Sequence, residues 1–212
     1  MLRLCAIILL VVLSISHAVA GPKVAGQFDY YVLALSWSPS WCALEGDARN
    51  AGQCGPNSEL GFSLHGLWPQ HELGWPSFCQ TIEPPPTRQA TAEMADIMGS
   101  SGLAWHQWDK HGRCSGLSAQ DYFLTSRKAY EAINRPDVFR QLLKPLSFPA
   151  PVVETAFLRA NPSLIPDGIS VTCSRGFFQE VRICLSKDLQ LRTCGRDVIQ
   201  DCQQRVVFPP LR

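Results

Sequence analysis

The chain has 212 residues, of which 19 are basic and 18 are acidic, for a formal net charge of +1. This length suits a single domain, and no internal repeat or low-complexity linker divides it. A protein that binds nucleic acid non-specifically usually carries a basic excess, so the balanced charge excludes that class. Any contact with a polyanion must therefore be confined to a local cleft.

The first twenty residues predict a signal peptide. Arg3 supplies the positive charge, residues 5–15 are apolar, and residues 18–20 (AVA) form a small-residue cleavage signal. The apolar run is shorter than the ~20 residues that a membrane span needs, so an uncleaved anchor is the weaker alternative. We expect cleavage near Ala20 and export, either to a periplasm or out of the cell. The mature chain, residues 21–212, is then one domain with no membrane attachment.

Cleavage at that point removes Cys5 and leaves eight cysteines. An even number in an exported protein predicts a disulfide framework, although eight cysteines allow about 105 pairings and the sequence leaves the choice open. The absence of any CxxC pair argues against a zinc site.

The N-terminal half of the mature chain predicts two strands before its first helix. Residues 28–37 are rich in Tyr, Val and Leu and predict a buried strand. Residues 61–67 predict a second strand, which we expect to end where Trp68 and Pro69 follow. The proline run at residues 84–86 predicts a loop, because proline lacks the backbone donor of a strand.

Three helices are expected in the middle of the chain. The first covers residues 87–98 and stops at Gly99, and the second starts near Trp105. The third covers residues 118–133, where Ser118 can cap the helix.

A shorter helix over residues 152–160 is followed by strands between residues 169 and 191. Turns at residues 174–176 and 186–188 separate these strands. Helices and strands are mixed without a strict βαβ alternation, so the predicted fold class is α+β.

Two short segments hold three of the five histidines of the chain. Residues 63–69 (SLHGLWP) contain His65, and residues 105–112 (WHQWDKHG) contain His106 and His111. Free imidazole titrates near pH ~6.5, so two imidazoles can act as general base and general acid near neutral pH. Together with a lysine and an aromatic ring, such a set suits the phosphodiester of RNA.

A helix through the second segment would place four polar side chains on one face, at about 0°, 100°, 40° and 140° around its axis. These side chains are His106, Gln107, Lys110 and His111. Gly112 can end this helix, and Cys114 can fix its end to another part of the chain.

Cleavage of RNA requires a base for the 2′-hydroxyl, an acid for the departing 5′-oxygen and a cation for the charged phosphorane. His65 and His111 can supply the first two, and Lys110 and His106 the third. Trp68 can stack on a base, which is worth ~1–3 kcal/mol in single-strand recognition.

Metal binding by His106 and His111 is the competing interpretation. Zinc helices of the HExxH kind space their histidines i and i+4, whereas these are i and i+5 with the cationic Lys110 between them. We therefore expect no metal. His71 is expected to be structural, and Trp37, Trp41 and Trp75 are expected to pack in the core or at a rim.

The two segments resemble the paired active-site signatures of the ribonuclease T2 family, the exported acid ribonucleases. Residues 65–69 read HGLWP and residues 106–112 read HQWDKHG, with Cys114 two positions beyond. The resemblance covers nearly the whole mature chain. It implies a central antiparallel β-sheet flanked by helices and stapled by disulfides.

The resemblance also implies a role for each site residue. His111 would be the general base and His65 the general acid, while His106 would hold the phosphate, Lys110 would stabilise the transition state, and Trp68 would lie at a base-binding site. The family needs no metal or other cofactor and forms a 2′,3′-cyclic phosphate that it opens to a 3′-phosphate. The implied disulfides are Cys42–Cys54, Cys79–Cys114, Cys173–Cys202 and Cys184–Cys194.

The chain departs from the family pattern at two positions that bear on activity. The family usually has Glu where this chain has Gln107, and glutamine can neither carry charge nor transfer a proton. Arg113 stands where Thr or Ser is favoured. Gln70 stands where some members place an acidic base-recognition residue, so base preference stays open. We predict retained activity with a shifted pH profile.

The leading hypothesis is an exported endoribonuclease that cleaves single-stranded RNA with low base specificity. We expect a monomer that does not act on DNA. The alternative is a secreted RNA-binding or interaction protein on the same scaffold, with catalysis weakened by Gln107. A metal hydrolase is the third candidate.

Overall fold

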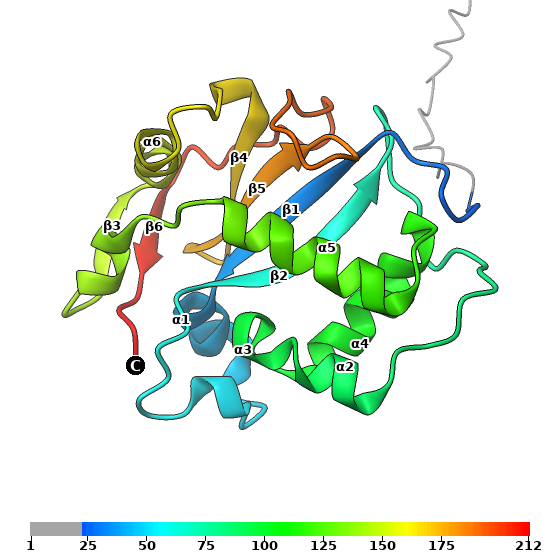
Figure 1. Cartoon of the computed structure of the whole chain (residues 1–212). Coiled ribbons are helices and arrows are strands. Elements are labelled where there is room, and N and C mark those ends of the chain that lie inside the picture. Colours follow the sequence, from blue (N-terminus) through cyan, green and yellow to red (C-terminus); the bar gives the residue numbers. More distant parts are fainter. Residues whose placement is uncertain (1–22) are drawn as a thin grey trace, which may run out of the picture.

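The computed structural model describes residues 23–212 (Figure 1). The predicted signal peptide and its cleavage near Ala20 lie outside the described residues. Within the part described, no helix has the length and apolar character needed to cross a membrane.

The described residues contain a six-stranded sheet in the order β2-β1-β5-β6-β3, with β4 also paired to β5. The strand pairs are antiparallel except for one parallel contact, between Phe177 of β5 and Val207 of β6. The predicted α+β class with an antiparallel sheet is confirmed. The strands are β1 (Tyr30–Trp37), β2 (Phe62–Gln70), β3 (Leu146–Pro149), β4 (Ile169–Ser174), β5 (Phe177–Leu185) and β6 (Arg205–Phe208).

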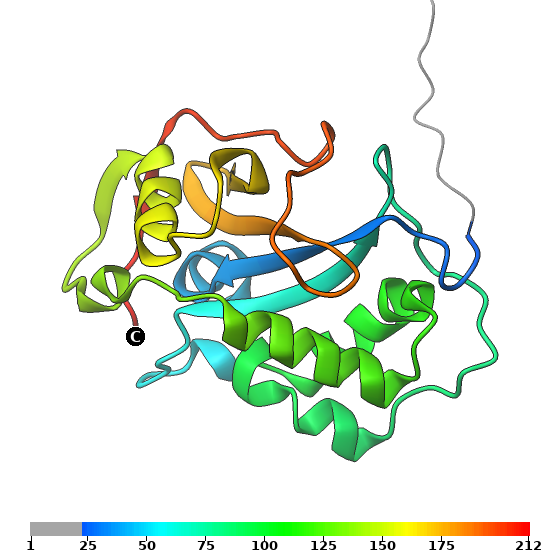
Figure 2. The same cartoon turned by 45° about the horizontal axis from the view of Figure 1, so that its top comes forward.

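Helices gather at both ends of this sheet. Figures 1 and 2 show α2 to α5 grouped beside β1 and β2, whereas α6 lies with β3 and β6. The helices are α1 (Ser38–Trp41), α2 (Arg88–Ala92), α3 (Ala95–Met98), α4 (Ser101–Lys110), α5 (Ala119–Ala132) and α6 (Pro151–Ala160). The shorter helical turns are η1 (Cys42–Gly46), η2 (Gly52–Cys54), η3 (Gly112–Ser115), η4 (Asp137–Gln141) and η5 (Pro166–Gly168).

Strand β1 is buried on both of its faces. Leu33, Leu35 and their alternate neighbours enter the main core. Tyr30 and Val32 point the other way, into a smaller cluster that Trp68 also contacts. Burial on both faces explains why this strand reads as a continuous apolar run. The smaller cluster supports the face of the sheet that carries the candidate site.

Strand β2 is longer than expected, and the prediction that Trp68 and Pro69 end it is wrong. These two residues pair with Val32 and Tyr31 of β1, and the strand continues to Gln70. Since β2 stands at the end of the strand order, its outer edge has no partner strand among the described residues. A proline is tolerated on such an edge because no ladder donor is needed there.

The helix expected over residues 87–98 is divided into α2 and α3. Arg127 donates a hydrogen bond to the Glu93 carbonyl at 2.7 Å and also pairs with Asp96. The Ile97 amide, which would bond Glu93 in a continuous helix, bonds the Met94 carbonyl instead. At the break between α2 and α3, the Glu93 carbonyl thus bonds the Arg127 side chain in place of the Ile97 amide.

Two other helix starts are set by serine caps. Ser118 accepts a hydrogen bond from the Asp121 amide, which confirms the predicted start of α5. Helix α4 begins at Ser101, four residues before the expected start near Trp105, because Ser100 accepts from the Leu103 amide.

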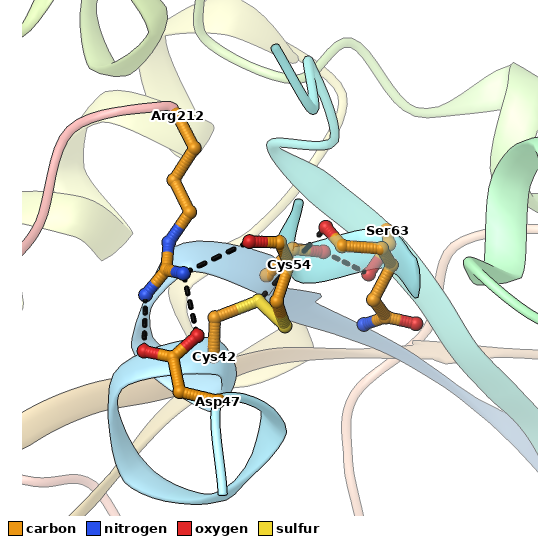
Figure 3. Close-up of a disulfide and its surroundings, with 7 residues drawn as sticks. Cys42, Asp47, Cys54, Ser63 and Arg212 are labelled. Carbon is orange, nitrogen blue, oxygen red and sulfur yellow. Dashed lines mark hydrogen bonds and ion pairs between the residues drawn. A yellow bond between two sulfur atoms is a disulfide. The ribbon is translucent and has the colours of Figure 1, made fainter. Parts of the chain in front are cut away.

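The described residues form disulfides between Cys42 and Cys54, Cys79 and Cys114, Cys173 and Cys202, and Cys184 and Cys194. These are the pairs that the family resemblance implies. Beside the first of them, Arg212 donates to both carboxylate oxygens of Asp47 and to the Cys54 carbonyl (Figure 3). This contact ties residues near the end of the chain to η1.

Candidate active site

The two histidine segments meet at one cavity of about 320 Å³. Every residue predicted to act on or bind substrate lines it: His65, Trp68, Gln70, His106, Gln107, Lys110 and His111. Helix α4 and its C-terminal cap form one wall, and strands β2 and β5 form the opposite wall. The structure therefore brings together all seven predicted residues.

A β-bulge in β2 turns His65 toward the cavity. The pairing with β1 shifts between Ala34 and Leu35, which leaves His65 as the extra residue. Leu64 and Leu67 consequently both reach the main core, although they are three positions apart. His65 and Trp68 face the other way. Bulges are enriched beside active sites because they redirect a side chain in this manner.

A second bulge does the same in β5. The pairing with β4 shifts between Thr172 and Cys173, and Gln179 is the extra residue. Phe178 and Val181 on either side of it lie in the core. Glu180 and the residue two positions on, Arg182, are therefore presented to the cavity.

Helix α4 approaches β2 closely through a glycine. A Cβ atom at Gly66 would lie 2.1 Å from Gln107 Oε1 and 2.4 Å from Trp68 Nε1. These two atoms form a hydrogen bond of 2.8 Å in which Trp68 donates. The end of α4 is also fixed by the Cys79–Cys114 disulfide. The second motif can therefore pack against the first only because residue 66 has no side chain.

Gly112 also acts through close packing, and it does not itself terminate the helix. Helix α4 ends at Lys110 with His111 as its cap. A Cβ atom at Gly112 would lie 2.5 Å from the Trp108 ring and 2.8 Å from Tyr122.

Trp68 stands between the two catalytic candidates. Its ring stacks on His111 with a centroid distance of 5.2 Å and meets His65 edge-on, also at 5.2 Å. The guanidinium carbon of Arg182 lies 5.4 Å from the Trp68 ring centroid. The Trp68 indole therefore lies between the imidazoles of His65 and His111 and keeps them apart. Its contact with a base stays a prediction.

His111 lies in an environment that favours the neutral imidazole. Its side chain is only 5% exposed, and Nδ1 is buried without a hydrogen-bond partner. Burial lowers the pKa of His111 from 6.5 to about 3, with further contributions from the positive charges of Lys110, His65 and His106. A neutral imidazole of this kind can accept a proton at mildly acidic and neutral pH.

His65 lies in the opposite environment, because Nδ1 donates to the carboxylate of Glu180. Glu180 is 2% exposed and also pairs with Arg182 at 3.2 Å. Burial alone would raise the pKa of Glu180, but the charges and hydrogen bonds of His65 and Arg182 outweigh it and lower that pKa to about 2. The Glu180 carboxylate is therefore ionised and accepts the hydrogen bond from the His65 ring.

The four polar side chains of the second segment face the same cavity, as the single helical face predicts, but they differ in burial. Gln107 and His111 are buried, Lys110 is half-buried, and His106 is exposed. All four still line the cavity. Among residues 23–212, no three His, Cys, Asp or Glu side chains are grouped to hold a metal ion.

Sequence reasoning missed Glu180 and Arg182, whereas the rim position expected as one alternative for Trp75 agrees with the structure. Trp75 lines the cavity and is half-exposed. The available signal was three polar residues, Gln179, Glu180 and Arg182, inside an otherwise apolar strand, residues 177–185 (FFQEVRICL). Asp197 also lines the cavity, from a loop far along the chain.

The geometry defines a class of site: two imidazoles held apart for acid–base work, with cationic groups beside them. A family model described as "Ribonuclease T2 family" matches residues 28–194. The chain belongs to the ribonuclease T2 family.

Two bacterial relatives illustrate the similarity. A "Ribonuclease" from Aeromonas hydrophila is 47% identical over 107 residues, covering 50% of this chain and 47% of the relative. A "Probable ribonuclease" from Haemophilus influenzae is 30% identical over 189 residues, covering 82% of this chain and 64% of the relative. This chain thus spans about half to two thirds of the length of these relatives.

Solved structures share the fold. An RNase-related protein from Calystegia sepium has a TM-score of 0.69 and 23% identity, covering 87% of this chain and 98% of its own. A point mutant of RNase MC1, solved in complex with 5′-UMP, has a TM-score of 0.56 and 19% identity, covering 77% of this chain and 91% of its own.

Proposed function

We propose that this protein is an endoribonuclease that cleaves single-stranded RNA by transesterification, without a metal or other cofactor. The observation that carries the proposal is the placement of His111 and His65 on one cavity, in environments of opposite kind. One imidazole is held neutral by burial and the other lies against a carboxylate. Titratable pairs whose environments differ in this way divide the acid and base roles.

In the proposed reaction, neutral His111 takes the proton of the 2′-hydroxyl, whose oxygen attacks the phosphorus. The bond to the 5′-oxygen breaks, and that oxygen receives its proton from His65. Lys110 and His106 stabilise the charge on the phosphorane. Water then opens the resulting 2′,3′-cyclic phosphate, with the two histidines in exchanged roles, and leaves a 3′-phosphate. DNA lacks the attacking hydroxyl and is not a substrate.

Several observations support an RNA substrate. The Aeromonas relative is named a ribonuclease and the Haemophilus relative a probable ribonuclease, and a mutant of RNase MC1, which shares the fold, has been solved with 5′-UMP. Trp68 and Gln70 line the cavity at positions where they can contact a base. With no acidic side chain at position 70, we propose low base specificity. We also propose a monomer.

We infer that the protein is exported. Four disulfides form readily only in an oxidising compartment, such as a periplasm or the extracellular space. The basic and apolar residues within positions 1–20 have the pattern of a signal peptide.

The test is digestion of yeast RNA by the mature protein between pH 4 and 8, with and without EDTA. We expect cleavage that survives EDTA, a transient 2′,3′-cyclic phosphate, and loss of activity in His65→Ala and His111→Ala. Loss in EDTA would instead indicate a metal hydrolase. Binding of RNA without cleavage at any pH would indicate the interaction protein, with catalysis weakened by Gln107.

A further inference from the structure

The carboxylate of Glu180 is bonded entirely by side chains. Its Oε1 accepts from His65 Nδ1 and, at 3.2 Å, from the Ser36 hydroxyl. Its Oε2 lies 3.2 Å from both Nε and Nη2 of Arg182. A buried carboxylate costs free energy that packing does not recover, so its presence in the middle of a sheet points to a role in the site.

The bond to Glu180 fixes which ring nitrogen of His65 can exchange a proton. An ionised carboxylate only accepts hydrogen bonds, so Nδ1 must carry a hydrogen. The other nitrogen, Nε2, then holds a proton when the ring is charged and a lone pair when it is neutral. Nε2 is therefore the atom through which His65 acts as acid and, in the second step, as base.

The cavity would disfavour a charged His65 without this carboxylate. Gln107 is uncharged, and its Oε1 is already bonded to Trp68. Among the other charged or titratable groups facing the pair, lysine and arginine side chains outnumber carboxylates. These groups are His106, Lys110 and His111 from α4 and its cap, Arg182 from β5, Asp197, and, around an adjoining cavity of about 490 Å³, Glu45, Arg49 and Arg175.

We propose that Glu180 is a positioning residue that holds His65 with Nδ1 protonated and supplies the counter-charge for its protonated form. This inference rests on the proposed function. In the cleavage step the Nε2–H bond breaks and an O5′–H bond forms, while Nδ1 keeps its hydrogen. Glu180 remains ionised throughout, and Nε2 regains a proton from water when the cyclic phosphate is opened.

The test compares Glu180→Gln with Arg182→Gln, because each substitution breaks the same ion pair from opposite ends. The readout is the pH dependence of kcat/KM on a dinucleoside phosphate, whose alkaline limb reports the acid of the free enzyme. In Glu180→Gln we expect the alkaline limb to move to lower pH. We also expect kcat near neutral pH to fall about 10- to 100-fold, which is less than the loss expected when the general acid itself is removed. In Arg182→Gln we expect the limb to move to higher pH, because the carboxylate charge is no longer shared.

A purely structural ion pair would move both variants in the same direction. That result, or an active Glu180→Gln protein with an unchanged pH profile, would overturn the inference. A wild-type protein without any RNA cleavage would contradict the proposed function instead.

A second measurement needs neither a variant nor a substrate. Nitrogen-15 chemical shifts of the His65 ring show which nitrogen carries the hydrogen in the neutral form. We expect protonated Nδ1. A neutral ring with its hydrogen on Nε2 would overturn the inference even if Glu180→Gln fails to fold.

Discussion

At residue 107, an amide occupies the centre of the site in place of the glutamate that the family usually has. Its Oε1 accepts from Trp68, which stacks on His111. A glutamate could accept the same bond, so the structural role of this position does not need a charge. What the amide removes is a negative charge close to His111, where burial and three cationic neighbours already lower the pKa.

Gln107→Glu is therefore expected to raise the pKa of His111, by about 1 unit for a charge at this range. The acidic limb of the kcat/KM profile should move to higher pH by that amount. Gln107→Leu serves as the control: it leaves the Trp68 N–H without a partner, at a cost of about 1–3 kcal/mol, and adds no charge. An acidic limb that stays in place in Gln107→Glu would contradict the assignment of His111 as base.

Among the elements, β2 and α4 depend on each other through Gly66. Gly66→Ala should lower stability by about 1–3 kcal/mol, as overpacking does, and also reduce kcat because it separates Gln107 from Trp68. Gly102→Ala in α4 is the matched control, since a Cβ there meets nothing within 4 Å. It should be neutral or stabilising by about 0.5–1 kcal/mol. Thermal melts measure the change in stability and steady-state rates measure the change in kcat. Equal effects of the two substitutions would contradict the packing role of Gly66.

The sequence predicts correctly those helices and strands that are determined by residues close together in the chain. Helix α5 follows from the Ser118 cap and its apolar stripe, and β1 follows from its apolar run. The two bulges depend on how neighbouring strands pair, so nothing within residues 61–67 reveals that His65 is the extra residue. Likewise, the Glu93 carbonyl at the break between α2 and α3 is bonded by Arg127, more than thirty residues further along the chain.

The same reason explains what was missed in the site. The histidine motifs were recognisable because their residues are adjacent in the chain. Glu180 lies 115 positions from His65 and shares no motif with it. A buried carboxylate can be found from sequence only as a charged residue within a largely apolar strand, which is a weak signal.

For the whole molecule, the site makes folding stability depend on pH. His111 takes up a proton near pH 6.5 when unfolded but only near pH 3 when folded. The free energy of unfolding therefore decreases as the pH falls from 6.5 to 3. Glu180, lowered from 4.5 to about 2, contributes stability above pH 4.5 that is lost between those values. Both effects make the protein less stable in acid.

The two windows can be separated experimentally. Between pH 6.5 and 4.5 only His111 of this pair contributes, with a slope of up to about 1.4 kcal/mol per pH unit. Thermal melts of His111→Asn should show a shallower loss of stability in that range than the wild type, and a similar loss below pH 4.5. Identical slopes throughout would mean that His111 is not held neutral by the fold.

The division of roles between the two histidines is tested most directly by changing the leaving group. A dinucleoside phosphate needs an acid for its 5′-oxygen, whereas uridine 3′-(4-nitrophenyl) phosphate releases a nitrophenolate that leaves without a proton. We predict that His65→Ala loses about 10²–10⁴-fold on the dinucleotide but less than about 10-fold on the aryl ester. His111→Ala should lose activity on both substrates. Equal losses of His65→Ala on the two substrates would contradict its role as the acid.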